Sequence, residues 1–174
     1  MITQKLLQEM FSYEDGNLYR KKVLGGEAIG KQAGWITVCN QRHYKKINIY
    51  KKTTYLHRMI FLFHYGYEPD YIDHINGDSL DNRIENLRPA TQSQNCANQT
   101  LKKNNTSGIK GVRYRKDTGK WTANVMVNRK NISLGCYENI EDAAKAYEQG
   151  SKKFFGEFAR TEQASERMLG KATE

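Results

Sequence analysis

A turn signal within residues 71–95 constrains the fold of this chain more than any other feature. The tripeptide Asn-Gly-Asp at 76–78 is a turn former between two extended segments. Asp73 and His74 are then expected near the end of one strand, and residues 86–88 on the strand that returns. The sequence therefore predicts one β-hairpin that carries these polar side chains.

A helix start signal follows the hairpin. Thr91, with Gln94 three positions later, matches a capping box, in which each side chain bonds to the backbone of the other residue. A helix is therefore expected to begin at Thr91 and to hold Asn95 in its first turns. The stretch thus predicts two strands followed directly by a helix.

Oxygen and imidazole groups gather on this predicted hairpin and helix. The Asp73 carboxylate and the Asn95 side-chain carbonyl are ligands of the kind that Mg²⁺ takes, and Mn²⁺ suits them too. A neutral His74 imidazole can take a proton from an attacking water near pH 7, while the metal stabilises charge on a phosphate. This combination indicates metal-dependent hydrolysis of a phosphodiester.

The charge balance favours a polyanionic partner. The chain has 28 Lys and Arg against 19 Asp and Glu, a net charge of +9, and a pI near 9.4. Residues 1–50 hold eight basic and four acidic residues, and residues 108–160 hold eleven and six, whereas 51–96 is nearly neutral. Nucleic acid is the leading candidate partner, and scattered lysines that only keep the protein in solution are the alternative.

The sequence does not favour a membrane protein, a secreted protein or a protein that binds a metal through cysteines. The mean hydropathy is −0.82, and no apolar run approaches the roughly 20 residues of a membrane span. The N-terminus lacks the features of a secretory signal. Cys39, Cys96 and Cys136 are widely separated and predict three reduced, structural thiols. We therefore expect a cytoplasmic protein without membrane contact.

The N-terminal part shows short extended segments and one helix. Residues 16–22, 34–38 and 44–50 are rich in strand formers and predict a small twisted sheet with basic edges. Residues 55–65 carry apolar side chains at helical spacing and predict a core helix. Residues 97–107 are polar, basic and without apolar periodicity, as expected of a linker.

The C-terminal part predicts a sheet covered by a helix. Residues 109–115, 121–127 and 131–136 alternate and read as an antiparallel three-stranded sheet. Because side chains alternate between the two faces of a strand, Arg113 and Arg115 are expected on one face of the first strand. Asn139 is expected to cap a helix whose buried face is formed by Ile140, Ala143, Ala144, Tyr147, Phe154 and Phe155.

The stretch from about Met10 to Asn95 resembles the HNH nuclease family found in phage homing endonucleases. The resemblance is carried by Gly16-Asn17-Leu18-Tyr19, by His57-Arg58, and by the Asp73-His74-Ile-Asn-Gly-Asp block with Asn82, Asn86, Leu87, Arg88 and Thr91. It implies a ββα-metal fold.

The same resemblance implies roles for individual residues. His74 becomes the general base, and Asn86 orients the loop and the histidine through hydrogen bonds. Asp73 and Asn95 hold the metal, with Asn95 standing where many members have His.

Other polar residues keep plain structural readings as alternatives. For Asn82, a role as an ordinary turn residue is expected as readily as a role in the site. His57 and Arg58 fit a buried His and a surface Arg at least as well as catalytic help, and His43 and His64 are assigned structural or surface roles.

Residues 107–158 resemble the plant ethylene-response-factor (APETALA-type) DNA-binding domain. Landmarks in the right order are Gly108-Ile-Lys110-Gly111-Val112-Arg113-Tyr-Arg115, Gly119-Lys120-Trp121-Thr-Ala123, Leu134-Gly135 and Glu141-Asp-Ala143-Ala144-Lys-Ala146-Tyr147. The resemblance implies sequence-specific DNA binding, with contact positions at Lys110, Arg113, Arg115, Asn124, Met126, Asn131 and Ser133. Asn131 and Ser133 stand where plant members carry Arg and Trp, so recognition is expected from the first-strand basic residues, and a merely solvated face is the alternative.

Together these features predict an α+β protein. A small N-terminal β-sheet and a ββα-metal nuclease module occupy residues 1–96, and a linker occupies 97–107. A three-stranded antiparallel sheet packed on one helix occupies 108–160, and a tail occupies 161–174.

The expected function is site-specific cleavage of double-stranded DNA with Mg²⁺ or Mn²⁺, in the cytoplasm of a bacterial host if a phage encodes the chain. A single active site favours a monomer that nicks, unless two chains meet. The alternatives are a DNA-binding regulator with an inactive centre and a restriction or defence nuclease.

Overall fold

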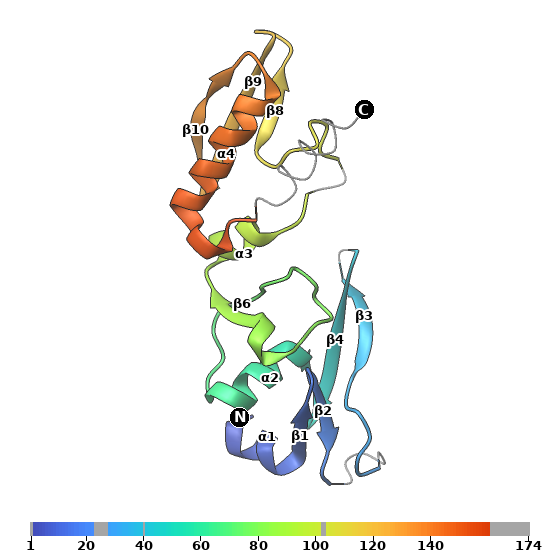
Figure 1. Ribbon diagram of the computed structural model, residues 1–174. Helices are drawn as coiled ribbons and strands as arrows, with labels where there is room; N and C mark the ends of the chain where they lie inside the picture. The colour runs from blue at the N-terminus through green and yellow to red at the C-terminus, as the bar shows by residue number, and fades with distance from the viewer. Residues whose placement is uncertain (1, 23–27, 40, 102–103, 161–174) are drawn as a thin grey trace. The chain divides into compact units, whose positions relative to one another are not determined.

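The computed structural model describes residues 2–22, 28–39, 41–101 and 104–160 (Figure 1). Over these residues the chain is a mixed α+β protein that divides into two compact units, 1–90 and 91–174. The tail predicted at 161–174 lies outside the described residues. No helix in the described ranges combines the length and the apolar character that crossing a membrane requires.

The first unit alternates short helices with antiparallel strands. Its strands form a β1–β2 hairpin, a β3–β4–β5 sheet and a β6–β7 hairpin. In chain order its elements are α1 (Gln4–Met10), β1 (Phe11–Glu14), β2 (Asn17–Arg20), β3 (Trp35–Cys39), β4 (Arg42–Ile49), β5 (Lys52–Tyr55), α2 (Leu56–Tyr65), β6 (Tyr71–His74), the 3-10 turn η1 (Ile84–Asn86) and β7 (Leu87–Ala90).

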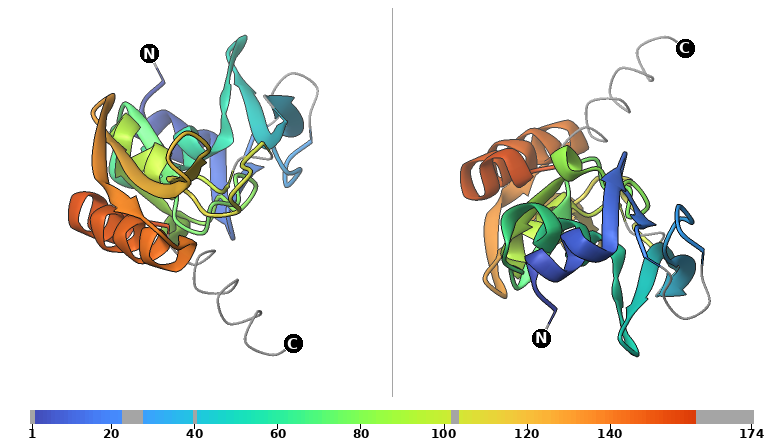
Figure 2. Two further views of the ribbon diagram at one scale, coloured as in Figure 1. Left: turned by 90° about the horizontal axis from the view of Figure 1, so that it is seen from above. Right: turned by 90° about the horizontal axis from the view of Figure 1, so that it is seen from below.

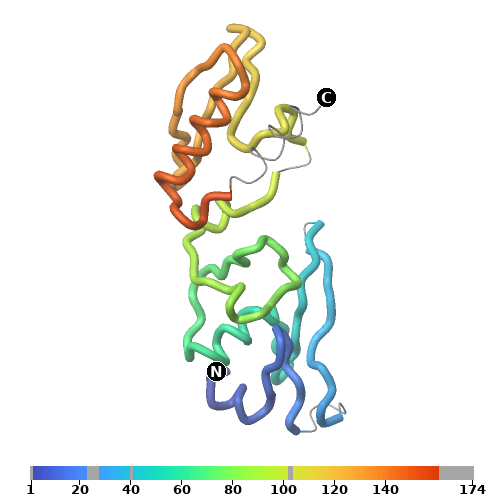
Figure 3. The backbone as a smooth tube through the Cα atoms, viewed as in Figure 1, coloured from blue at the N-terminus to red at the C-terminus, as the bar shows by residue number. Residues whose placement is uncertain are grey.

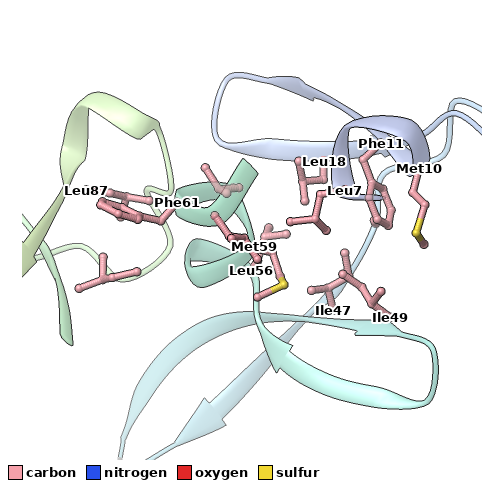
Figure 4. Close-up of a cluster of buried hydrophobic side chains, with 14 residues drawn as sticks. Leu7, Met10, Phe11, Leu18, Ile47, Ile49, Leu56, Met59, Phe61 and Leu87 are labelled. Carbon is pink, nitrogen blue, oxygen red and sulfur yellow. The ribbon is translucent and has the colours of Figure 1, made fainter. Parts of the chain in front are cut away.

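Helix α2 lies at the centre of the first unit's core (Figure 4). Its residues 59–62 are all buried, so apolar neighbours surround it rather than cover one stripe. Gly66 ends the helix in the left-handed conformation, with φ of 78°. The prediction of a core helix over 55–65 is confirmed. The remaining core side chains are contributed by α1, β1, β2, β4 and the hairpin, and include Leu7, Met10, Phe11, Leu18, Ile47, Ile49, Ile72 and Leu87.

The hairpin predicted from the Asn-Gly-Asp turn signal is present. Strands β6 and β7 pair antiparallel, with Asp73 opposite Arg88 and His74 opposite Leu87. The chain between the two strands forms a long loop over residues 75–86, which Figure 3 traces in green. Asp73 and His74, at the end of β6, therefore lie beside β7 and next to the start of this loop.

The second unit places one long helix against a three-stranded sheet, as predicted. The two views of Figure 2 show α4 alongside the strands, and the sheet order is β10–β9–β8. Phe154, predicted on the buried face, is 39% exposed instead, because Phe155 takes the buried position at the end of the helix. The elements are α3 (Gln92–Asn98), β8 (Val112–Arg115), β9 (Lys120–Val127), β10 (Lys130–Tyr137), α4 (Ile140–Phe155) and the 3-10 turn η2 (Gly156–Phe158).

Close packing of small residues joins the sheet to α4. Ala123 of β9 and Ala143 and Ala144 of α4 are fully buried. Gly111, before β8, has φ of +70°, and a Cβ there would lie 2.1 Å from the Tyr147 ring. This position therefore requires glycine for both its conformation and its contact.

Helix α3 has the predicted start and belongs with the second unit. Thr91 and Gln94 form both hydrogen bonds of the capping box. Ser93 Oγ lies 3.2 Å from Asn128 Oδ1 and accepts from the Asn128 backbone N–H at 2.9 Å. These bonds explain why the division between the units falls before α3 rather than after it.

Candidate functional site

Asp73 is a buried carboxylate held by an arginine across the hairpin. The Asp73 side chain is 4% exposed and that of Arg88 11%. Arg88 Nε and a terminal guanidinium nitrogen each lie 2.9 Å from Asp73 Oδ2. The ion pair fixes the carboxylate at the end of β6, next to His74 in the chain.

His74 is a buried imidazole with a defined hydrogen-bond partner. Its Nε2 lies 3.0 Å from Asn82 Oδ1, and both residues are buried. Burial lowers the pKa of His74, and the Asn82 hydrogen bond and the nearby carboxylate of Asp73 act in the opposite direction. When the ring hydrogen is on Nε2, His74 donates it to Asn82 and the basic lone pair is on Nδ1. The neutral, proton-accepting form of the imidazole is thus favoured.

His57 of α2 packs against the His74 ring. The two ring centroids are 5.1 Å apart, with the planes at 76°. Burial, helped by electrostatic effects of His74 and Arg58, lowers the pKa of His57 to about 3. His57 is therefore a neutral ring that limits the positions open to His74.

Asn86 joins the two ends of the loop that leaves β6. Its Oδ1 accepts from the Asn76 backbone N–H at 3.0 Å. Its Nδ2 donates to Asn76 Oδ1 at 3.0 Å and to the Asp81 carbonyl at 2.8 Å. All polar groups of this buried amide are thus used inside the loop, and they hold the segment that carries Asn82.

The first hairpin of the chain supports the same loop. Gly16, in the β1–β2 turn, has φ of +74°, and a Cβ there would lie 2.7 Å from the Arg83 nitrogen and 2.9 Å from the Asn82 carbonyl carbon. The Tyr13 hydroxyl accepts from the Ile84 N–H at 3.0 Å. Glycine at position 16 is needed for this close approach.

Arg58 supports the strand that carries the site from its other end. It pairs with Glu68 at 2.8 Å, and its guanidinium donates to the carbonyl of Pro69 at 3.0 Å and to that of Asp70 at 3.4 Å. These residues lie directly before β6. His57 therefore contacts the last residue of the strand, and its neighbour Arg58 contacts the residues just before the strand begins.

The donor chemistry of the site fits a hard cation with few protein ligands. Asp73 supplies a carboxylate, while Asn86 and the Nε2 of His74 are engaged within the protein. The described residues contain no cluster of three or more His, Cys, Asp and Glu arranged to hold a metal. A cation bound through Asp73 would thus take most of its ligands from other oxygens, such as phosphate and water.

Asn95, the other predicted metal ligand, lies in α3 of the second unit and is half-buried. Its backbone N–H donates to the Thr91 carbonyl at 3.0 Å, as expected in the first turns of a helix. The prediction of its secondary structure is confirmed, and its role toward the metal stays a prediction.

Six of the seven predicted DNA contacts share one face of the second unit's sheet. Strand register pairs Arg113 with Thr122, Asn124 with Ser133 and Met126 with Asn131. Because side chains alternate along a strand, these positions point to the same side, together with Arg115. Arg115 forms an ion pair with Asp117. The face is mixed in charge and largely exposed.

Lys110 has a different environment from the other six. Its ammonium donates to the carbonyls of Ala97 at 2.5 Å and Gln99 at 2.9 Å, and to that of Cys96 at 3.2 Å. Burial lowers its pKa to about 8, and the positive charge of Arg160 lowers it further, against an opposing effect of Cys96. Lys110 thus satisfies the last carbonyls of α3.

The sequence did not identify the residues that act by holding His74 in position. Asn82 and His57 were left with plain structural alternatives, because nothing in a linear pattern shows that either side chain reaches His74. The signal available was their place in the motif: Asn82 lies in the same block as His74, and His57 begins the His-Arg pair.

Two sequence families match separate parts of the chain. The family described as "HNH endonuclease" matches residues 54–97, and the "AP2 domain" family matches residues 107–157. The first range contains the β6–β7 hairpin and all of α3 except Asn98, and the second contains the sheet and α4. No solved structure gives a significant match to the chain.

Two viral proteins are similar to the chain. "Protein 3.8" of Escherichia phage T7 is 34% identical over 90 residues, which cover 52% of this chain and 74% of that protein. "Uncharacterized HNH endonuclease L560" of Acanthamoeba polyphaga mimivirus is 36% identical over 107 residues, which cover 60% of this chain and 54% of the relative. The chain thus spans about half the length of the mimivirus protein.

Proposed function

We propose, on the premise that this chain belongs to the HNH endonuclease family and carries an AP2 domain, that it is a site-specific, metal-dependent DNA endonuclease of the homing type. The observation that carries the proposal is the end of β6. There a buried carboxylate, Asp73, stands next to a buried imidazole, His74, whose Nε2 is bonded to Asn82. Phosphodiester hydrolysis uses both kinds of group.

His74 is assigned the role of general base. Because its Nε2 is engaged by Asn82, the proton of the attacking water passes to Nδ1. Asn86 keeps the loop, and with it Asn82, in place. His57 restricts rotation of the His74 ring. Because these contacts orient the base before the reaction, less entropy is lost when the transition state forms.

Asp73 and Asn95 are assigned to a divalent cation, Mg²⁺ or Mn²⁺. When bound, such an ion stabilises negative charge on the phosphate and on the departing oxygen. Arg88 holds the Asp73 carboxylate in a fixed orientation through Oδ2. The residues around Asp73 thus prepare one protein ligand in advance.

The two parts of the chain are assigned separate tasks. The β6–β7 hairpin with α3 cuts, and the sheet face of residues 108–160 selects the site, chiefly through Arg113 and Arg115. Arginine pairs well with guanine in the major groove, and neighbouring cations bind phosphates. One active site per chain favours a nick by a monomer. A phage relative favours action in the cytoplasm of an infected cell.

A plasmid cleavage assay tests this function. The substrate carries the genomic locus of the gene, and the ends of the products are mapped after incubation with Mg²⁺, Mn²⁺ or a chelator. Metal-dependent cutting at one position is expected. Specific binding without cutting under any of these conditions would instead identify a DNA-binding regulator.

A further inference from the structure

The β3–β4–β5 sheet has one face that is turned away from the core. Ile47 and Ile49 of β4 point into the core and are buried. Their neighbours in the strand, which alternate with them, point to the other side. Strand register adds residues from both flanking strands to that side, because Trp35 and Tyr55 both pair with Lys46.

Aromatic and basic side chains lie on this outward side together with Thr37, Cys39, Asn48 and Thr53. We name the aromatic and basic ones the aromatic–basic face. Trp35 is 45% exposed, Arg42 is exposed, and the other members are half-buried. Its members are Trp35, Arg42, Tyr44, Lys46 and Tyr55.

The rings of the face are fixed by contacts with one another. Tyr44 and Tyr55 meet edge to face, with centroids 5.3 Å apart. Lys46 Nζ lies 5.1 Å from the centroid of the Tyr55 ring. A cation over a fixed ring is already partly ordered, so a phosphate that binds it costs less side-chain entropy.

The face continues into the candidate active site. Tyr55 stacks on His57, with centroids 5.4 Å apart and planes at 22°. His57 in turn contacts the His74 ring at 5.1 Å. Two ring contacts therefore separate the face from the assigned general base, and all of these residues belong to the first unit.

The charge of this region is of one sign. Residues 28–67 contain seven Lys and Arg and no Asp or Glu. A partner with many negative charges at regular spacing suits such a surface. Phosphate groups of DNA have this property.

We infer that the aromatic–basic face is a second DNA-contacting surface, which binds the backbone of the duplex beside the bond to be cut. The inference rests on the proposed function. It adds a second contact surface whose members, apart from Tyr55, lie outside both sequence-family matches. Arg42 and Lys46 bind phosphates, and Trp35 packs against a sugar or a base edge. Contacts of this kind add affinity that does not depend on sequence.

Salt-dependent binding tests the inference with a matched pair of double variants. Arg42→Gln/Lys46→Gln removes two charges from the face. Lys51→Gln/Lys52→Gln removes two charges from the β4–β5 turn and the opposite side of the same sheet. Each full-length protein binds a 40-base-pair duplex of mixed sequence in chelator, and anisotropy gives Kd at several salt concentrations.

The face variant is expected to weaken binding and to reduce the slope of log Kd against log salt by about 2, because each phosphate contact contributes about 0.9. The control variant is expected to keep nearly the wild-type slope. Equal slopes for both double variants would overturn the inference. Far-UV circular dichroism confirms that both variants fold.

Trp35 supplies a second readout that does not rely on charge. In a Trp121→Phe background Trp35 is the one remaining tryptophan of the sequence. Its emission is expected to be quenched as the duplex saturates the protein. Unchanged emission at saturation would contradict contact at this face, and stronger binding of single-stranded RNA than of duplex DNA would exclude the assigned partner.

The outcomes separate this inference from the proposed function. If the wild type binds DNA with the predicted slope difference but never cuts, the endonuclease proposal fails and the surface stands. If the wild type cuts and the Arg42→Gln/Lys46→Gln variant binds and cuts like it, the surface fails and the endonuclease proposal stands.

Discussion

His74 shares its buried position with two side chains that the reaction does not consume. Asn82 bonds to Nε2 at 3.0 Å, and His57 contacts the ring. Neither contact changes the chemistry that an imidazole can perform. Asn82 decides which nitrogen carries the hydrogen, and His57 limits how the ring is oriented. The effect of losing either contact can therefore be measured apart from the loss of His74 itself.

The first prediction concerns Asn82→Leu. This change keeps a side chain of similar size and removes the acceptor for Nε2, so cleavage is expected to fall about 10- to 100-fold through misorientation of the base. ¹⁵N spectra of the ring nitrogens, assigned with His74→Ala, are expected to show Nε2–H in the wild type and a mixed tautomer in the variant. Wild-type spectra with hydrogen on Nδ1 would contradict the assignment.

The second prediction is a pH dependence of stability that arises from His57. Its pKa is about 3 in the folded protein against 6.5 for an ordinary histidine, so the unfolded chain binds the proton more readily. Stability from this group is complete above pH 6.5 and is lost as the pH falls toward 3, by roughly 2 kcal/mol between pH 7 and pH 5.

Urea unfolding of wild type and of His57→Phe at both pH values measures this contribution. The loss of stability on acidification is expected to be smaller in His57→Phe. The exposed His43, changed to Phe, is the matched control and is expected to leave the wild-type dependence intact. Identical pH dependence in the wild type and His57→Phe would refute the assignment.

At the scale of elements, α3 depends on one lysine from outside it. Lys110 donates to three carbonyls at or just beyond the end of the helix. Lys110→Met is expected to destabilise the protein by about 1–3 kcal/mol, because those carbonyls lose a charged donor. Its salt slope for DNA binding is expected to stay unchanged, whereas Arg113→Ala is expected to weaken specific binding by about 1–3 kcal/mol and to relax the preference at the base that Arg113 reads. A reduced slope for Lys110→Met would show that this lysine contacts phosphate instead.

The sheet of the second unit carries a cysteine, Cys136, whose reaction with a thiol reagent reports on its outward face. Cys136 is exposed and free and pairs with Thr122, which pairs in turn with Arg113. DNA bound on this face is expected to slow the reaction of Cys136 with a maleimide at least about tenfold. The reaction rate of Cys96 in α3 is expected to stay the same and serves as the internal reference. Equal protection of both thiols, or of neither, would argue against this face as the contact surface.

Local signals predicted the elements that carry the site, and tertiary contacts account for what they missed. The Asn-Gly-Asp turn and the Thr91 capping box act within a few residues, so the hairpin and the start of α3 follow from the sequence. Helix α1 was missed although Thr3 caps it, because seven residues are too few for a clear periodicity. The partners of His74 and Lys110 come from other elements, and a linear pattern does not reveal such contacts.

At the scale of the whole molecule, cutting and site selection are assigned to different parts of one chain. The two family matches do not overlap along the sequence, and the buried cores of the two units are separate. Changes to the sheet face of the second unit are therefore expected to alter where the DNA is bound, and changes at His74 to alter whether it is cut.

The most direct test measures binding and single-turnover cleavage on the same labelled DNA, for wild type and for His74→Ala, with Mg²⁺ and with chelator. Equal affinity is expected for both proteins. Cleavage is expected only from the wild type with metal, with the rate in the variant lower by at least about 100-fold. Cleavage by His74→Ala at the wild-type rate would contradict the central claim that this imidazole is the general base.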